Sequence, residues 1–193
     1  MEDAPPSSPP AADQSWTLLQ RRRLAADSRV TVLADQYQVP ADGVRTYYLL
    51  QERGGAIVVA LTPEEEVVLV RQYRPPVATF LWELPAGALE GDHADPLERA
   101  KTELRQETGF TAPAWEELGA LLAAPHRSTE RDTYFLARGA THQAQQDLDP
   151  GEAVQVRLVP FREALAMIER GDIQTASTIV ALYRAAVRLG RLA

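Results

Sequence analysis

The 193-residue sequence predicts an α+β protein arranged as an α/β/α sandwich, and three observations lead to this fold class. Alternating or apolar runs typical of strands fill much of the chain beyond residue 28. One amphipathic helix interrupts these strands, and two further helical segments follow them, at residues 161–170 and 176–189. Strands broken by one helix and finished by helices indicate a layered domain in which helices cover a sheet.

The first 14 residues differ from the rest of the chain. They are rich in Pro, Ser and Ala, and they hold too few bulky apolar groups to offset the entropy lost on ordering. We therefore expect residues 1–14 to be disordered and residues 15–193 to form a single domain. A chain of this length buries a substantial core.

Four strands are predicted before the helix, at residues 29–39, 44–51, 56–61 and 67–72. Pro40-Ala41-Asp42-Gly43 lies between the first two and has the composition of a tight turn, because Pro40 ends a strand and Gly43 adopts a positive φ readily. These two strands are therefore predicted to pair as an antiparallel hairpin. Three more strands are predicted after the helix, at residues 115–123, 132–137 and 153–159.

Local signals define both ends of the central helix. Asp95 has a side chain suited to capping the start, Pro96 suits the first helical position, and Glu98 is placed to complete a capping box. Gly109 supplies the left-handed residue with which many helices end. The sequence therefore predicts a helix over residues 96–108.

Glu103 and Glu107 are four residues apart on this helix, so their side chains lie on one face, one turn apart. Two like charges so placed repel each other. They form either a solvated acidic face, the usual case for such a pair, or a site at which Mg²⁺ or Mn²⁺ removes the repulsion. The spacing alone leaves both interpretations open.

Composition excludes several classes of function. The chain has no cysteine, which excludes disulfides, thiolate catalysis and cysteine-ligated metal, and its three histidines lack metal-ligand spacing. A formal net charge of −7 disfavours nonspecific nucleic-acid binding. No apolar run is long enough for a membrane span, and the start lacks signal-peptide features, so a cytoplasmic location is expected.

The residues around the acidic pair carry a family motif. Gly87 opens it and residues 102–110, TELRQETGF, close it. This pattern resembles the signature of the Nudix hydrolases, in which a glycine precedes an Arg-Glu-aliphatic-any-Glu-Glu-any-Gly-aliphatic segment. The match is degenerate, because Thr102 stands in place of the arginine, Gln106 in place of one glutamate, and the intervening segment is one residue longer.

Four further segments resemble one branch of that family, the ADP-ribose and nucleoside-diphosphate-sugar pyrophosphatases. These segments are VVLVRQYR at residues 67–74, LWELPAG at residues 81–87, Pro125, and Ser128-Thr129-Glu130-Arg131. The resemblance implies a Nudix fold with a mixed sheet and an N-terminal region of antiparallel strands, residues 15–52. It also implies that these strands form the interface of a homodimer.

The resemblance implies a metal site and two catalytic carboxylates. The backbone carbonyl of Ala86, with Glu103 and Glu107, is expected to bind Mg²⁺ or Mn²⁺, and all three are hard oxygen ligands. Glu107 is expected to act in catalysis, and Glu130 to act as general base from a loop. The plainer interpretation of Glu130 is an exposed side chain paired with Arg131.

Four residues are predicted to contact a nucleoside diphosphate substrate. Arg74, with Arg71 as a companion, is placed to bind the diphosphate, because a guanidinium matches phosphate geometry. Gln106 offers an amide oxygen in the signature helix. Tyr47 is expected to stack on the base, with packing in the core as the alternative, and its neighbour Tyr48 faces the opposite side of the strand.

The activity implied is metal-dependent hydrolysis of the pyrophosphate bond of ADP-ribose or a related nucleoside diphosphate sugar. GDP-mannose or another sugar nucleotide is an alternative substrate. Thr102 and Gln106 favour a second hypothesis, in which an impaired Nudix domain binds a nucleotide sugar as a sensor without turning it over.

Overall fold

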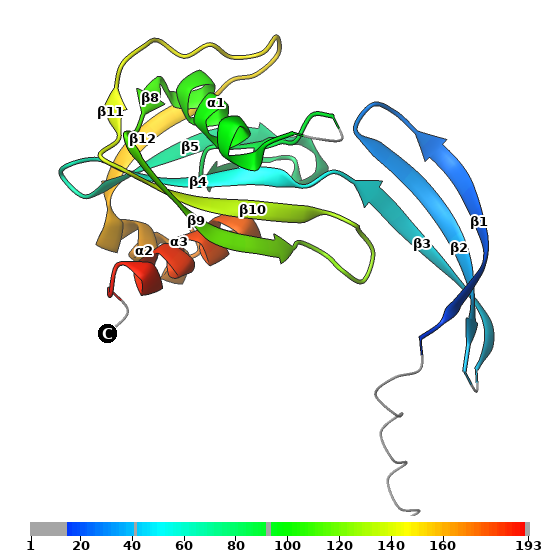
Figure 1. Ribbon diagram of the computed structural model, residues 1–193. Coiled ribbons are helices and arrows are strands. Elements are labelled where there is room, and N and C mark those ends of the chain that lie inside the picture. Colours follow the sequence, from blue (N-terminus) through cyan, green and yellow to red (C-terminus); the bar gives the residue numbers. More distant parts are fainter. Residues whose placement is uncertain (1–14, 41, 92–93, 192–193) are drawn as a thin grey trace, which may run out of the picture. The chain divides into compact units, whose positions relative to one another are not determined.

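The computed structural model describes residues 15–40, 42–91 and 94–191 (Figure 1). The prediction of disorder for residues 1–14 lies outside the described residues, as does Ala41 of the predicted turn. The chain divides into two compact units, the first made of the residues up to Glu52 with His126–Ser128, and the second of Arg53–Pro125 with Thr129–Ala193.

The first unit is an antiparallel sheet in the order β1-β2-β3, with strands Thr17–Ala26, Val30–Val39 and Gly43–Glu52. The predicted hairpin is confirmed as β2 and β3, and Gly43 has the expected positive φ of 76°. Asp35 lies opposite both Arg21 and Tyr47 in the register. Its buried carboxylate accepts hydrogen bonds from Arg21 Nε at 2.8 Å and Nη2 at 2.6 Å, which ties β1 to β2.

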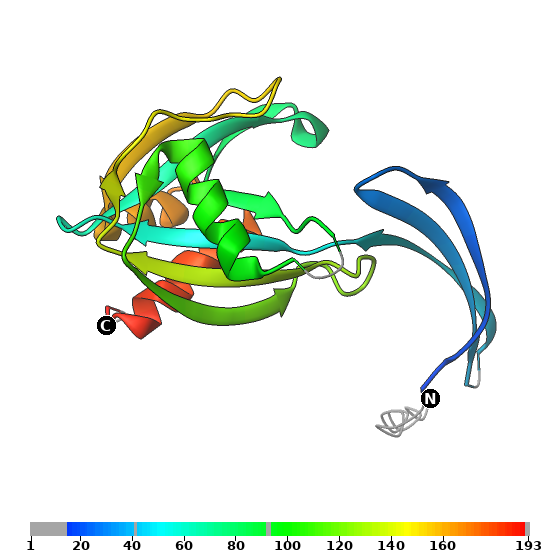
Figure 2. The ribbon, with the colours of Figure 1, turned by 45° about the horizontal axis from the view of Figure 1, so that its top comes forward.

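The second unit contains a mixed sheet in the order β12-β5-β4-β10-β9 (Figure 2). Strands β4 and β10 are parallel, and the other pairs are antiparallel. Two short strands extend the sheet, β6 against β5 and β7 against β4, and β8 pairs with β11 apart from it. The strand bounds are Gly55–Leu61 (β4), Glu66–Arg74 (β5), Thr79–Glu83 (β6), Ala86–Ala88 (β7), Phe110–Thr111 (β8), Ala114–Leu122 (β9), Arg131–Arg138 (β10), Thr141–His142 (β11) and Gln155–Pro160 (β12). A 3-10 turn, Pro75–Val77, joins β5 to β6.

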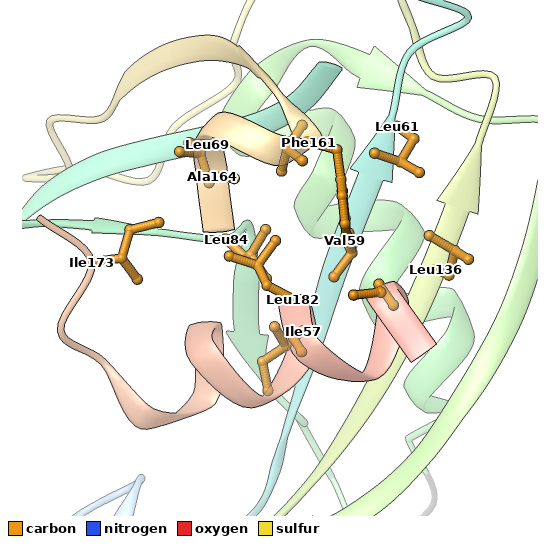
Figure 3. Packing of buried hydrophobic residues seen from close by; sticks show 14 of the residues in the cluster. Ile57, Val59, Leu61, Leu69, Leu84, Leu136, Phe161, Ala164, Ile173 and Leu182 are labelled. Carbon is orange, nitrogen blue, oxygen red and sulfur yellow. The ribbon is translucent and has the colours of Figure 1, made fainter. Parts of the chain in front are cut away.

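Helices cover both faces of this sheet, which confirms the α/β/α arrangement. Helix α1, Pro96–Thr108, lies on one face, where Leu104 packs with Val58 and Val68. Helices α2, Phe161–Glu169, and α3, Ala176–Arg188, lie on the other. There Leu182 packs with Val59 and Leu69, as Figure 3 shows. Burial of apolar surface on both faces supplies the main driving force for this fold.

The central helix matches its prediction at both ends. The Asp95 carboxylate accepts a hydrogen bond from the backbone N–H of Leu97 at 2.8 Å, and Gly109 ends the helix with φ 74°. Glu98 accepts a hydrogen bond from Lys101 instead of completing a capping box. Across the described ranges, no helix combines the length and apolar character needed to span a membrane.

Candidate active site

Glu103 and Glu107 lie on the buried side of α1, and this placement excludes one of the two interpretations of the pair. Glu103 is 7% exposed and Glu107 is 5% exposed. A solvated acidic face would leave both side chains in water, so that interpretation is wrong. Buried carboxylates are unfavourable unless a proton, a cation or hydrogen bonds compensate their charge.

The turn before β7 meets this pair directly. The backbone N–H of Ala86 donates a hydrogen bond to Glu107 Oε2 at 3.1 Å. A Cβ atom placed on Gly87 would lie 2.0 Å from Glu103 Oε1, so only glycine admits the carboxylate at this distance. The turn is itself fixed, because the carbonyl of Pro85 accepts a hydrogen bond from the backbone N–H of Val58 at 3.0 Å. Strand β7 and helix α1 therefore form a cradle for two carboxylates.

Burial dominates the electrostatics of the pair. The pKa of Glu107 is raised to about 8, first by burial and then by the nearby Glu103 charge, whereas the Ala86 N–H opposes the rise. Burial also raises the pKa of Glu103, against the opposing charge of Arg99. A cation placed between the two carboxylates would compensate both the burial of their charges and their mutual repulsion, and would so favour the ionised form of Glu107.

The oxygen ligands of this cradle suit Mg²⁺ or Mn²⁺. Among the described residues, no group of three or more His, Cys, Asp or Glu side chains is gathered to hold a metal ion. The two carboxylates and the carbonyl of Ala86 would therefore fill only part of the coordination shell of a metal ion, and water or substrate phosphate oxygens would fill the rest. Mg²⁺ commonly binds in this way, through one or two carboxylates with waters and phosphates.

Arg74 lies on the α1 side of the sheet, paired with a residue that the sequence analysis did not single out. Its Nε and Nη2 contact Glu83 Oε2 at 2.8 Å and 2.7 Å, and Glu83 is 8% exposed. The Arg74 charge also lowers the pKa of Glu107, although less than burial raises it. A buried carboxylate thus orients the guanidinium predicted to contact the diphosphate.

Arg71 lies on the opposite face of β5 from Arg74, because residues three apart in a strand point to opposite sides. Its guanidinium lies 5.0 Å from the centroid of Phe80 and 5.9 Å from that of Trp82, both on β6. Arg71 therefore does not share a face of the sheet with Arg74, and its role at the diphosphate stays a prediction.

Glu130 and Gln106 are both half-buried in the second unit. Glu130 lies between β9 and β10, and its backbone carbonyl accepts a hydrogen bond from Ala123 at 3.2 Å. The pKa of Tyr134 is raised to about 12, first by burial and then by the charge of Asp132, with Arg184 opposing the rise and Glu130 adding to it. The backbone carbonyl of Gln106 accepts a hydrogen bond from the backbone N–H of Asp147 at 2.9 Å. The roles of Glu130 as base and of Gln106 at the substrate stay predictions.

Tyr47 belongs to the first unit, on β3. Its ring centroid lies 5.3 Å from that of Trp16 and 6.0 Å from that of Tyr37, so three aromatic rings gather on one face of the sheet. Tyr47 is 39% exposed and Tyr48 is 67% exposed. The ring cluster leaves part of Tyr47 accessible, and stacking on a base stays a prediction.

Arg99 is a second residue that the sequence analysis missed. Its Nη2 lies 2.5 Å from Glu103 Oε1, four residues further along α1. The four-residue spacing of Arg99 and Glu103 was visible in the sequence, but the burial of Glu103 was not. Exposed ion pairs at this spacing contribute little to stability, so the spacing alone did not single out Arg99.

Known proteins resemble this chain over most of its length. The NUDIX domain family model matches residues 51–180. The ADP-ribose pyrophosphatase of Mycobacterium tuberculosis is 29% identical over 163 residues, which cover 84% of this chain and 79% of that protein. The GDP-mannose pyrophosphatase of Yersinia enterocolitica is 32% identical over 143 residues, which cover 69% and 73%. The solved structure described as "Crystal structure of ADP compounds hydrolase" has a TM-score of 0.82 at 20% identity, covering 94% of this chain and all of that one.

The structural likeness confirms the predicted fold, a mixed sheet with helices and an N-terminal region of antiparallel strands. The named relatives agree with the branch indicated by residues 67–131. The family model covers more than half of the sequence, including the whole cradle around Glu103 and Glu107. The chain therefore belongs to the Nudix family, as its degenerate motif predicted.

Proposed function

We propose that this protein is a Nudix pyrophosphatase that hydrolyses the pyrophosphate bond of ADP-ribose or a related nucleoside diphosphate sugar with Mg²⁺ or Mn²⁺. The products are a nucleoside monophosphate and a sugar phosphate. Relatives named ADP-ribose pyrophosphatase in two bacteria support this substrate class. Relatives named GDP-mannose pyrophosphatase favour a sugar nucleotide with another base as the second candidate.

The buried pair of Glu103 and Glu107 against Ala86-Gly87 is the observation that carries the proposal. A pyrophosphate linkage is inert because its negative charges repel an incoming nucleophile. A bound divalent ion would neutralise this charge and orient a water molecule. The protein's part is to hold two carboxylates and a backbone carbonyl at one place, where they select a hard cation.

The remaining residues act on water and substrate. As the water oxygen attacks a phosphorus atom, Glu130 accepts its proton, and the bond from phosphorus to the bridging oxygen breaks. Arg74 contacts the diphosphate, with Glu83 holding its guanidinium in one orientation. These assignments rest on the resemblance for Glu130 and on placement beside the acidic pair for Arg74.

A binding module without turnover is the competing function. Thr102 and Gln106 favour it, because both replace charged residues of the signature. Two buried carboxylates packed against Gly87, where a Cβ atom would displace the Glu103 side chain, count against it, since a pure binder of an anionic ligand gains nothing from buried negative charge.

The test is a panel of ADP-ribose, GDP-mannose and other nucleoside diphosphate sugars, assayed for nucleoside monophosphate release with and without Mg²⁺ or Mn²⁺. We expect metal-dependent turnover by the wild type and loss of about 100-fold or more in kcat for Glu107→Gln. Glu98→Gln, on the exposed side of the same helix, is the matched control and should keep full activity. Substrate binding without turnover in any metal would establish the competing function instead.

We also propose a homodimer formed through β1, β2 and β3. The first unit exposes large apolar side chains on these strands, with Val44 and Tyr48 together on one face of β3. A second copy would bury this surface and supply a hydrophobic driving force. The cytoplasmic location stays a prediction from the sequence.

A further inference from the structure

Arg99 stands out among the basic residues of α1. Its side chain is 24% exposed and lies 2.5 Å from Glu103, which is itself buried. The other basic residues of this helix are paired with exposed carboxylates, Lys101 with Glu98 and Arg105 with Asp147 at 3.7 Å. Exposed pairs of that kind contribute little, whereas a largely desolvated guanidinium on a buried carboxylate fixes its geometry strongly.

One oxygen of Glu103 meets both Arg99 and Gly87. Arg99 Nη2 forms an ion pair with Oε1, and Oε1 is also the atom that a Cβ atom on Gly87 would approach most closely. A carboxylate has two oxygens and about four lone-pair directions, so a guanidinium on one oxygen leaves the other available to a cation. The arrangement therefore restricts the rotation of Glu103 without using up its capacity to bind metal.

The position of Arg99 in the sequence explains why this residue matters in this chain. The family signature places an arginine at position 102, and this chain has Thr102 there, which carries no charge. Residues four apart on a helix face each other, so a guanidinium at position 99 reaches Glu103 from one turn before it. Arg99 Nη1 also lies 3.5 Å from Glu90, in the segment that leads from β7 to α1.

Burial of Arg99 is unfavourable by itself. Its Nε is buried and makes no hydrogen bond with the described residues, and such an unpaired donor destabilises a protein by about 1–3 kcal/mol. A residue needed only for solubility would extend into water. The buried position is explained if the guanidinium is required beside Glu103.

We propose that Arg99 is a positioning residue that substitutes for the missing signature arginine and holds the Glu103 carboxylate against Gly87 in the orientation that binds the divalent cation. The inference rests on the proposed function, because it assumes that Glu103 is a metal ligand. It goes beyond that function in assigning the task to a residue outside the signature.

The test measures Mn²⁺ binding to the full chain by the electron paramagnetic resonance signal of free Mn²⁺, alongside kcat and KM for ADP-ribose. For Arg99→Ala we expect Mn²⁺ affinity and kcat to fall about 10- to 100-fold, with little change in KM, as for other residues that orient metal ligands. Arg99→Lys retains a cation and should recover part of both losses. Arg105→Gln, on the exposed side of the helix, is the control and should match the wild type.

Arg99→Gln keeps the length of the side chain and a hydrogen-bond donor, so it carries the test if the alanine variant does not fold. Unchanged or tighter Mn²⁺ binding in Arg99→Gln or Arg99→Ala would overturn the inference, because a guanidinium that competes with the cation gives tighter binding when removed. If the wild type binds Mn²⁺ and the variants match it, the inference alone fails. If the wild type itself binds no Mn²⁺, the proposed function fails as well.

Discussion

Glu103 Oε1 lies so close to the backbone of Gly87 that a Cβ atom at residue 87 would be 2.0 Å from it. The contact joins helix α1 to strand β7, two elements that the chain connects through residues 89–95. It shows why a glycine opens the motif: the carboxylate occupies the volume that any other side chain would fill.

Gly87→Ala is therefore expected to displace the Glu103 carboxylate while leaving the sheet intact. A shift of about 1 Å in a catalytic group lowers turnover by about 100-fold, and we expect a loss of that order in kcat. The measurement is steady-state hydrolysis of ADP-ribose, with circular dichroism to verify folding. Ala88→Ser, at the exposed neighbouring position, should behave as the wild type. Full activity in Gly87→Ala would show that the close contact has no catalytic importance.

The raised pKa of Glu107 predicts how stability depends on pH in the absence of metal. Because the folded protein holds this proton up to a pKa of about 8, against an ordinary value of 4.5, the contribution of Glu107 to stability is complete below 4.5 and falls as pH rises through this interval. The shift corresponds to at most about 5 kcal/mol, since one pKa unit is worth about 1.4 kcal/mol.

Chemical unfolding at about pH 5 and about pH 8 measures this effect. The Glu107→Gln variant removes the ionisable group, so it should lose less stability than the wild type between the two values. Mn²⁺ should stabilise the wild type more at the higher pH, because fewer Glu107 side chains then carry a proton that competes with the cation. The cation should have little effect on the stability of the variant. Equal pH dependence in the two proteins would mean that Glu107 titrates normally.

Local sequence signals were sufficient for some elements and insufficient for others. Asp95, Pro96 and Gly109 act within one turn of chain, so they defined α1 without knowledge of the fold. Strand β1 was not predicted as a separate strand, because its residues are exposed throughout and its Gln-Arg-Arg-Arg run shows no alternation.

The residues near the acidic pair that the sequence analysis missed owe their importance to contacts between elements. Glu83 meets Arg74 because β6 pairs with β5 in a register that places Glu83 opposite Val70, on the same face of the sheet as Arg74. The importance of Arg99 depends on the burial of Glu103 beneath β7, which no local pattern reveals. The separation of Arg71 from Arg74, by contrast, follows from strand alternation alone and was available in the sequence.

Glu130→Gln separates proton transfer from metal binding. A general base contributes about 100- to 10,000-fold to turnover, so we expect a loss in that range in kcat. Mn²⁺ affinity should match the wild type, because Glu130 is not among the proposed ligands. Glu117→Gln on the neighbouring strand β9 serves as a control for loss of a carboxylate. A large loss of Mn²⁺ affinity in Glu130→Gln would instead place this residue among the metal ligands.

Tyr47→Ala tests whether this ring stacks on the base of the substrate. Aromatic stacking contributes about 0.5–1.5 kcal/mol, so its loss should raise KM for ADP-ribose by up to about 10-fold with little change in kcat. Tyr47→Phe keeps the ring and should retain a wild-type KM. The ring contacts with Trp16 and Tyr37 also contribute to the packing of the first unit, so thermal unfolding is measured in parallel. A variant that loses stability while keeping its KM would assign Tyr47 to packing within the sheet and remove it from the substrate site.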